Sequence, residues 1–449
     1  MTVLTEHEYV CIEKDDFGLR ETRSKECRPI LGFSTWSTQI LDGIPGYGGR
    51  HDQPWFNEKS IREISDCLRA KMPQYEFINL DAGWSNACDR YGRWIYRTDL
   101  FPKGLKALSK YLEQNGQKLG VYILPGIRRD AADANLPIKG HAGHRLGELC
   151  RLKKQGNGFP DTTYMPDEHN DLVQAYYDSL ADLFADWNIS YVKIDGCGPA
   201  ESDSLPDTRA CLSMMHRAFT RHNIFIELSW SSDIEYSKDW AVFANGTRIF
   251  SDIESYSTKT MTSSYRVLQR IAKVSEWADA AVENEFYIDL DVVLVGMTVN
   301  DRCVDGLDND DVRISCISFW ALTSSIFCIG SDPRRIPTKY LTWFNHPGIL
   351  EIHQTGIMPR PIGSSQSKKQ VWWKRMPDGR VCVGLFNVHV FPFILGISCH
   401  VKVHLEDVGV VGRVQIKDVW TGQDMGIYSE SYSVSLRPGQ CQILMLTIL

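Results

Sequence analysis

Tyr191-Val-Lys-Ile-Asp-Gly-Cys197 is a short apolar run that ends in a carboxylate and a glycine. It is one of eight such runs between about residues 28 and 345, and the stretches between them have the hydrophobic pattern of amphipathic helices. Alternation of this kind is typical of βαβ units and a parallel sheet. Eight repeats over this length predict a (β/α)8 TIM barrel. A Rossmann fold is disfavoured, because no glycine-rich phosphate motif follows the first run.

Eight apolar runs are predicted to be the strands of the barrel. They are Ile30–Trp36, Phe77–Asp81, Leu119–Leu124, Tyr191–Asp195, Ile224–Trp230, Arg248–Asp252, Phe286–Asp291 and Ile326–Gly330. The segments predicted as helices include Ser60–Lys71, Gly104–Asn115, Asp171–Trp187, Leu205–His222 and Asp311–Ser324. A long polar stretch, Pro125 to about Asn170, separates the third strand from the fourth, and a connection of this length is usually a functional loop.

The pattern changes after His346–Pro347, where apolar and polar residues alternate and turn sequences separate the runs. This is typical of an antiparallel β domain. The predicted strands there are Gln370–Arg375, Val381–Val388, Val401–Leu405, Arg413–Val419 and Cys441–Leu446. We therefore predict an N-terminal extension (1–27), a (β/α)8 catalytic barrel (28–350) and an antiparallel β-sandwich domain (351–449).

The composition restricts the class of protein. A chain of 449 residues is too long for one ordinary core. Its net charge of −7 and the lack of a basic run with interleaved aromatic residues argue against a nucleic-acid partner. No apolar run is long enough to span a membrane, so we expect no membrane partner. The N-terminal residues carry charges where a signal peptide has its apolar stretch, which favours the cytoplasm over a secreted mature form.

Polar residues at the ends of the predicted strands are the candidates for chemistry, because active sites of such barrels lie at the carboxyl ends of the strands. They are Trp36, Asp81, Tyr122, Lys193, Asp195, Ser229, Trp230, Asp252, Asp289 and Asp291. Four strands thus carry carboxylates to one end, although like charges repel and burial penalises them. Two carboxylates with opposed roles are what glycoside hydrolysis needs.

Two pairs within strands strengthen this interpretation. Lys193 and Asp195 are two residues apart and therefore face the same side of a strand, where the cation would keep the carboxylate ionised. Arg248 and Asp252 have the same parity. The alternatives are a turn or helix-capping role for Asp195 and a structural salt bridge between Arg248 and Asp252.

The chain resembles glycoside hydrolase family 27, the α-galactosidases and α-N-acetylgalactosaminidases, through a series of motifs in the family order. These are Leu31-Gly-Phe-Ser-Thr-Trp36, Tyr75-Glu-Phe-Ile-Asn-Leu-Asp-Ala-Gly-Trp84, Leu119-Gly-Val-Tyr122, Tyr191–Cys197, Thr247-Arg-Ile-Phe-Ser-Asp-Ile-Glu-Ser-Tyr256 and Trp320-Ala-Leu-Thr-Ser-Ser followed by Gly330-Ser-Asp-Pro-Arg334. They cover roughly residues 28–350. The family's C-terminal antiparallel β domain agrees with the pattern of the remaining residues.

The resemblance implies a retaining reaction with Asp195 as nucleophile and Asp252 as general acid/base. It implies that Trp36 forms an apolar wall, that Asp81 and Lys193 hold sugar hydroxyls, and that Arg248 approaches the substituent at the 2-position. The residues expected to complete the sugar site are Tyr122, Ser229, Trp230 and Asp291. Neither a metal nor a cofactor is implied, in agreement with 13 scattered cysteines that form no CxxC pair.

Three departures from the family pattern bear on the sugar. Ala82 replaces the second acid of the family's strand two, which helps to recognise the axial hydroxyl of galactose. Ser229 is small at a position near the 2-substituent and leaves room for an N-acetyl group. The 125–170 segment is longer than the family's disulfide-bearing loop, so a Cys150–Cys197 bond and free thiols both stay open.

We therefore expect a retaining exo-α-glycosidase that acts on terminal galactose-like residues of an oligosaccharide or glycoside. The alternatives are an α-N-acetylgalactosaminidase, a β-L-arabinopyranosidase, or a non-catalytic sugar-binding barrel. Presence of both Asp195 and Asp252 argues against the last, because a binding protein needs neither. Assembly into a homo-oligomer is left open.

Overall fold

The computed structural model of the protein describes residues 28–42, 55–201, 203–257, 259–389 and 398–449. The predicted N-terminal extension, 1–27, lies outside this part of the chain. The chain divides into two compact units. The first contains Asn79–Glu113 and Lys118–Thr247, and the second contains Pro29–Ile78, Gln114–Gln117 and Arg248–Leu449. The predicted domain boundary near residue 350 stays a prediction.

Eight strands form one parallel sheet in the order β11-β10-β9-β8-β5-β2-β1-β14. Their bounds are β1 (Leu31–Ser34), β2 (Phe77–Leu80), β5 (Lys118–Ile123), β8 (Ile189–Ile194), β9 (Phe225–Leu228), β10 (Gly246–Arg248), β11 (Tyr287–Asp289) and β14 (Phe327–Ile329). Parallel bridges Asp289↔Ile326 and Val293↔Ile329 join the two end strands of this order. The sheet therefore closes, and the prediction of a (β/α)8 barrel is confirmed.

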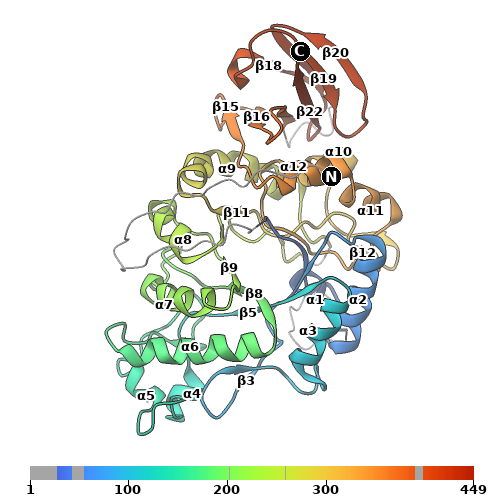
Figure 1. Cartoon of the computed structure of the whole chain (residues 1–449). Coiled ribbons are helices and arrows are strands. Elements are labelled where there is room, and N and C mark those ends of the chain that lie inside the picture. Colours follow the sequence, from blue (N-terminus) through green and yellow to red (C-terminus); the bar gives the residue numbers. More distant parts are fainter. Residues whose placement is uncertain (1–27, 43–54, 202, 258, 390–397) are drawn as a thin grey trace. The chain divides into compact units, whose positions relative to one another are not determined.

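Helices alternate with these strands along the sequence (Figure 1). The helices are α1 (Trp36–Asp42), α2 (Glu58–Lys71), α3 (Gly104–Gln114), α4 (Arg129–Asp133), α5 (Leu146–Leu149), α6 (Asp171–Asp186), α7 (Arg209–Thr220), α8 (Ser237–Phe243), α9 (Ser264–Asn284), α10 (Asp310–Leu322), α11 (Thr338–Phe344) and α12 (Pro347–Gln354). Several begin at a side-chain cap. Asn57, Asn170, Ser263 and Asn309 each accept a hydrogen bond from an amide in the first turn of α2, α6, α9 and α10.

Two stretches differ from their sequence-based description. The sixth strand is predicted to reach Asp252, but β10 ends at Arg248. The Ile249 amide still donates to the Asp289 carbonyl of β11 at 3.2 Å, and 250–252 lie outside any strand. The long polar stretch after β5 has structure of its own. It contains α4, α5 and a hairpin of β6 (Ile127–Arg128) and β7 (Thr163–Tyr164). Short hairpins also form from β3 (Ala87–Cys88) with β4 (Trp94–Ile95) and from β12 (Thr298–Val299) with β13 (Arg302–Cys303).

The C-terminal strands form two antiparallel sheets, as predicted from their alternating pattern. A six-stranded sheet has the order β15-β16-β17-β22-β19-β20, and β18 pairs with β21. Their bounds are β15 (Arg360–Ile362), β16 (Lys369–Arg375), β17 (Val381–Asn387), β18 (Cys399–His404), β19 (Val414–Asp418), β20 (Asp424–Tyr428), β21 (Ser431–Leu436) and β22 (Cys441–Ile448). Buried aliphatic side chains from both sheets, among them Val383, Val403 and Leu444, form one core. The domain is a β-sandwich.

Helix α10 packs against the sandwich within the second unit. The Phe319 ring contacts Trp372 of β16 and Phe386 of β17 edge-on, with centroid distances of 5.4 and 5.5 Å. Gly384 of β17 gives Leu322 room, because a Cβ atom there would lie 2.6 Å from the Leu322 Cδ2 atom. Tight aromatic packing of this kind adds to the free energy of burying the rings.

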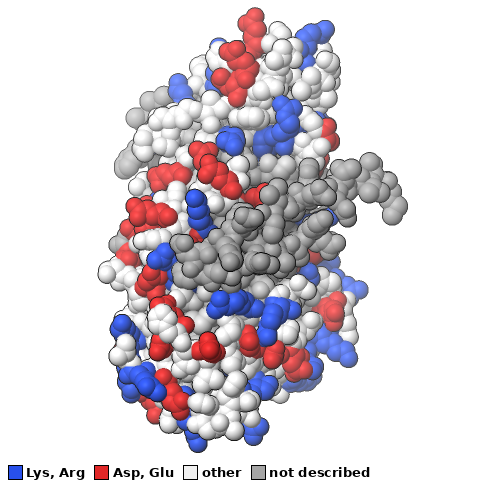
Figure 2. Space-filling view, turned by 60° about the vertical axis from the view of Figure 1, so that its left-hand side comes forward, with Lys and Arg blue, Asp and Glu red and all other residues white. Residues whose placement is uncertain are grey.

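Acidic and basic side chains are interspersed over the described part of the face drawn in Figure 2. Among the described residues, no helix is both long and apolar enough to cross a membrane.

Replacing Phe319 by alanine is predicted to lower the free energy of unfolding by about 3–5 kcal/mol, because it leaves a cavity between α10 and the sandwich. Chemical denaturation measures this. Ile427, which is 51% exposed on β20, provides the matched control, and Ile427→Ala should change stability by less than about 0.5 kcal/mol. Equal effects of both substitutions would contradict a docking role for Phe319.

Candidate active site

The candidate nucleophile, Asp195, directly follows β8 in the first unit. Its amide donates to the Ile123 carbonyl oxygen of β5 at 3.0 Å, which fixes the backbone at the end of the strand. Gly196 adopts φ +72 and donates its amide to Asp195 Oδ1 at 2.9 Å. The left-handed turn suits glycine, and the carboxylate it holds is partly exposed. Asp195 is therefore an oriented and accessible acid.

Tyr122 of β5 is a hydrogen-bond partner of this carboxylate. Burial raises the pKa of the Tyr122 phenol well above its ordinary value, and the negative charges of Asp195 and Asp81 raise it further. The phenol therefore keeps its proton and donates to Asp195. A hydrogen bond donated to a carboxylate favours the ionised form that a nucleophile needs.

Asp81 and Lys193, which the resemblance implies hold sugar hydroxyls, form a buried ion pair beside this tyrosine. Lys193 Nζ lies 3.0 Å from Asp81 Oδ2, and Asp81 is 2% exposed. The Ala82 amide donates to the other oxygen, Oδ1, at 2.8 Å. Glu227 of β9 is buried and directly opposite Lys193 in the strand register. Lys193 thus has two acidic neighbours, Asp81 and Glu227. The sequence alone did not identify Glu227 as part of the site.

Ser229 and Trp230 follow β9 and differ in their environments. The Ser229 amide donates to the Ile194 carbonyl at 2.8 Å, and its hydroxyl is buried with no hydrogen-bond partner among the described residues. Trp230 has φ +128, donates its indole N–H to Asp203 Oδ2 at 2.8 Å and contacts the Phe159 ring edge-on at 5.2 Å. A partly exposed tryptophan held by its N–H in an unusual backbone conformation suits a wall better than a space-filling role.

Two arginines of the long loop after β5 form ion pairs with aspartates of the same loop. Arg128 Nη2 lies 2.6 Å from Asp130 Oδ2, and Arg129 Nη1 lies 2.6 Å from Asp161 Oδ1. These pairs indicate a structural role for both arginines within the loop. Cys150 of this loop is a buried free thiol. The disulfide with Cys197 that the resemblance left open is therefore not formed.

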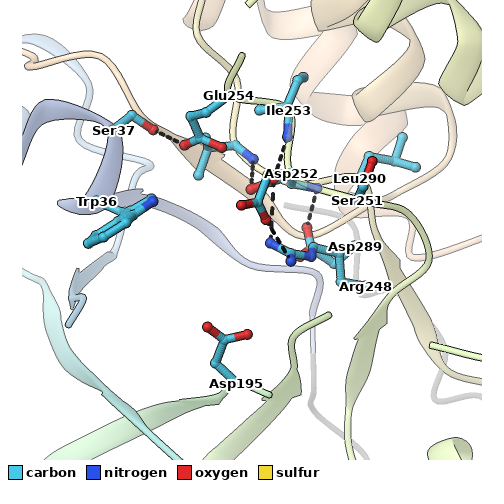
Figure 3. A network of polar contacts seen from close by, with 12 residues as sticks. Trp36, Ser37, Asp195, Arg248, Ser251, Asp252, Ile253, Glu254, Asp289 and Leu290 are labelled. Carbon is cyan, nitrogen blue, oxygen red and sulfur yellow. Dashed lines mark hydrogen bonds and ion pairs between the residues drawn. The ribbon is translucent and has the colours of Figure 1, made fainter. Parts of the chain in front are cut away.

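In the second unit, Arg248 lies between two carboxylates. Its Nη2 atom is 2.7 Å from Asp252 Oδ1 (Figure 3). Its Nη1 atom is 3.5 Å from Asp291 Oδ2. Arg248 and Asp291 are 6% and 7% exposed, whereas the Asp252 side chain is 38% exposed. Asp291 also accepts the Ile253 amide at 2.8 Å. The predicted Arg248–Asp252 pair thus exists, and Asp252 is its accessible member.

Two arginines of α9 hold the backbone around Asp252. Arg266 Nη1 donates to the Asp252 carbonyl at 2.8 Å, and Arg270 Nη2 donates to the Ser251 carbonyl at 2.5 Å. Arg270 Nε also donates to the Leu290 carbonyl at 2.9 Å. Burial lowers the pKa of Arg270 to about 10, so it stays charged at neutral pH. These hydrogen bonds fix the backbone of Ser251 and Asp252, which lie outside any strand.

Glu254 is a second acid beside Asp252 that the sequence reasoning missed. It is 2% exposed, and Ser37 Oγ donates to its Oε1 at 2.5 Å (Figure 3). Burial, followed by the charges of Asp291 and Asp252, raises the pKa of Glu254 to about 8. Its spacing of two residues from Asp252 was the available signal, because residues two apart in extended chain share a side.

Tyr256 links the candidate acid/base to the predicted wall. Its phenol oxygen lies 2.7 Å from Asp252 Oδ2, and Trp36 Nε1 donates to it at 3.1 Å. Trp36, expected at the end of the first strand, instead begins α1 and is partly exposed. The structure therefore brings Asp81, Tyr122, Lys193 and Asp195 together in the first unit, and Trp36, Arg248, Asp252 and Asp291 together in the second.

The described acids of the candidate site do not form a metal-binding group. Within the described parts of the chain, no group of three or more His, Cys, Asp or Glu could hold a metal ion. The acids described above are instead paired with arginine, lysine, tyrosine and backbone amides.

Glu254→Gln is predicted to change how stability depends on pH. The Glu254 carboxyl has a pKa of about 8 in the folded protein against 4.5 as its ordinary value, so the folded state binds more protons between these pH values. The free energy of unfolding then falls as pH rises from 5 to 8, by about 2–4 kcal/mol from this group. The glutamine variant should lose that part of the fall, as measured by denaturation at both pH values.

Glu283→Gln on the exposed surface of α9 is the matched control and should retain the wild-type dependence. An unchanged fall in Glu254→Gln would show that this carboxyl is already ionised at pH 5.

Comparison with known proteins relates the chain to glycoside hydrolases. Residues 46–269 match the model described as the glycosyl hydrolases family 31 TIM-barrel domain, and residues 366–446 match the alpha galactosidase C-terminal beta sandwich domain. Alpha-galactosidase 3 of Hypocrea jecorina is 25% identical over 464 residues, which cover 95% of this chain and 72% of that protein. The alpha-galactosidase of Oryza sativa subsp. japonica is 23% identical, with 93% and 84% covered.

Solved structures share the fold. A GH27 β-L-arabinopyranosidase from Geobacillus stearothermophilus superposes with a TM-score of 0.79 at 22% identity, covering 94% of this chain and 96% of that chain. Alpha-galactosidase I from Mortierella vinacea gives a TM-score of 0.68 at 15% identity, with 94% and 97% covered. The two models name different families of glycosyl hydrolases, but the α-galactosidase relatives align with both matched segments of this chain. The chain is therefore a glycoside hydrolase related to the α-galactosidases.

Proposed function

We propose that the enzyme is a retaining exo-glycosidase that removes terminal α-linked galactose-like residues, with Asp195 as nucleophile and Asp252 as general acid/base. One observation carries the choice of residues. Of the five acids predicted at the strand ends, Asp81, Asp289 and Asp291 are buried, at 2%, 4% and 7% exposure. Asp195 and Asp252 are partly exposed and are held by neighbouring donors. A reacting carboxylate must reach the substrate and stay oriented.

In the first step, the Asp195 carboxylate attacks the anomeric carbon and forms an ester bond. The bond between that carbon and the glycosidic oxygen breaks, and the oxygen takes the proton of the Asp252 carboxylic acid as the leaving group departs. Tyr122 and the Gly196 amide support the ionised nucleophile by donating hydrogen bonds to it.

In the second step, a water molecule attacks the same carbon and gives a proton to the Asp252 carboxylate. The ester bond to Asp195 breaks, and both carboxyl groups return to their starting states. Two inversions give net retention. The mechanism requires the two carboxyl groups to be about 5–5.5 Å apart in the working enzyme.

The remaining site residues serve to bind the sugar in this proposal. The Asp81–Lys193 pair presents an acceptor and a donor to ring hydroxyls, while Trp36 and Trp230 offer aromatic faces to its apolar C–H groups. Arg248 and Ser229 lie nearest the 2-position substituent by the family resemblance, and Asp291 supports Arg248.

Two residues bear on the identity of the sugar. Ala82 supplies no side-chain acceptor where the family has an acid for the axial hydroxyl of galactose. β-L-arabinopyranose has the same axial hydroxyl and lacks only the hydroxymethyl group, so it stays an alternative to galactose. Ser229 is small, and its buried hydroxyl has no partner among the described residues, which fits the amide group of α-N-acetylgalactosamine. p-Nitrophenyl glycosides of all three sugars will rank them, and failure to cleave any α-glycoside in a broader panel would contradict the proposal.

Azide will separate the roles of the two acids. In Asp195→Ala, azide replaces the missing nucleophile and should give the glycosyl azide with inverted configuration. In Asp252→Ala, azide should attack the covalent intermediate from an activated substrate and give the retained configuration. Both variants should lose at least about 100-fold in kcat/KM without azide. Asp186→Asn, an exposed acid paired with Lys106, is the control and should keep wild-type activity. The same azide product from both alanine variants would contradict the assignment.

Ala82→Asp is predicted to change the sugar preference. A charged hydrogen bond contributes about 1.5–3 kcal/mol, so kcat/KM for the α-galactoside relative to the α-glucoside, in which the corresponding hydroxyl is equatorial, should rise roughly 10- to 150-fold. Ala82→Asn, which is similar in size but uncharged, should give a smaller rise. No change in the ratio for either variant would show that residue 82 does not face the sugar.

A further inference from the structure

Tyr256 has a hydrogen-bond arrangement suited to a group that alternates between acid and base. An indole N–H can only donate, so the Tyr256 oxygen accepts from Trp36 Nε1 at 3.1 Å. Its own O–H then lies toward Asp252 Oδ2 at 2.7 Å. The phenol oxygen keeps a further lone pair, because a tyrosine hydroxyl has one proton and two acceptor sites.

Two partners of the Asp252 carboxyl group within the described part of the chain, Arg248 and Tyr256, differ in this respect. Arg248 Nη2 lies 2.7 Å from Oδ1, and a guanidinium can only donate. The phenol on the Oδ2 side can donate to the carboxylate or accept from the carboxylic acid. Of the two, only Tyr256 can therefore stay bonded when Asp252 carries a proton on the oxygen that faces it.

We propose that Tyr256 is a positioning residue for the general acid/base, which donates to ionised Asp252 and accepts from protonated Asp252 while Trp36 holds its oxygen in place. The inference rests on the proposed role of Asp252. No bond is made or broken at Tyr256. Its proton stays on the phenol and only changes direction, while the proton that is transferred moves between Asp252 and the leaving group or water.

The state of the phenol agrees with this role. Desolvation and the negative charges of Glu254 and Asp252 raise its pKa well above the ordinary value of a tyrosine. The phenol therefore stays protonated over the working pH range and does not compete as an acid.

The backbone and exposure of Tyr256 also indicate a local function. It adopts φ +53, a left-handed conformation that is uncommon for a tyrosine and costs free energy. Its side chain is 44% exposed, so core packing does not account for that conformation. The strained turn brings the phenol back to a residue four positions earlier in the chain.

Other charged groups around Asp252 within this unit also influence the pH dependence of its ionisation. Arg248 contacts the carboxylate, Arg266 binds its carbonyl oxygen, and Asp291 and Glu254 add negative charge. These groups are the same in a Tyr256→Phe variant, so a difference in pH dependence between that variant and wild type reports the phenol.

The test compares Tyr256→Phe with wild type on glycosides that differ in leaving group. For an alkyl or disaccharide substrate, whose departure needs a proton, kcat/KM should fall about 10- to 100-fold. For a 2,4-dinitrophenyl glycoside of the same sugar, which leaves without one, the fall should be less than about 3-fold. The basic limb of the kcat/KM profile should move up by roughly 0.5–1 pH unit, because the carboxylate loses a donor that favours its ionised form.

Two further variants sharpen the result. Tyr265→Phe, at the exposed start of α9 with 56% exposure, should leave both substrates and the pH limb unchanged. Trp36→Phe removes the indole donor but keeps a ring, and should move the basic limb in the same direction as Tyr256→Phe. Thermal unfolding checks that each variant is folded.

The outcomes separate the two proposals. If wild-type protein cleaves no glycoside, the proposed function fails. If it does, but Tyr256→Phe slows both substrates equally or leaves the pH limb in place, the role of Tyr256 is overturned and the function stands.

Discussion

The guanidinium of Arg248 lies between the carboxylates of Asp252 and Asp291, and the residues after β10 are organised around it. Glu254 brings a third acid into the same small region. Burial, followed by the negative charges of Asp291 and Asp252, raises the pKa of Glu254 to about 8, so this carboxyl is largely protonated at neutral pH. Removing the arginine would leave buried like charges facing each other, which costs more free energy than a surface ion pair contributes. Charge balance at this point therefore supports both the fold and the reactivity of Asp252.

Much of this arrangement could be predicted from the sequence, because the barrel imposes a simple rule. Parallel strands end at the same side, so the polar residue that closes each apolar run belongs to the site. That rule identified Asp81, Asp195, Asp252 and Asp291, and the spacing of Arg248 from Asp252 predicted their pairing. The alternating pattern after residue 350 similarly predicted the β-sandwich, because each of its strands buries one face.

The residues that were missed lie where the chain leaves regular structure. Strand β10 ends at Arg248, and the positions of Glu254 and Tyr256 depend on bonds from α9 and on a left-handed turn at Tyr256. Neither feature has a sequence period that could be recognised. Glu227 was missed for another reason: its partner position is set by strand register, which a single strand's pattern does not contain. Docking of α10 on the sandwich likewise depends on tertiary contacts of Phe319 rather than on local propensity.

The central claim is that Asp195 forms a covalent bond to the sugar. The most direct measurement is to incubate the enzyme with an activated 2-deoxy-2-fluoro glycoside of its preferred sugar, in which the electronegative fluorine slows turnover of the intermediate. Peptide mapping by mass spectrometry then locates the label. The account predicts one sugar per chain, attached to the Asp195 carboxylate in the peptide that contains Tyr191–Cys197. A label on another residue, or an active enzyme that releases its sugar with inverted configuration and forms no adduct, would contradict it.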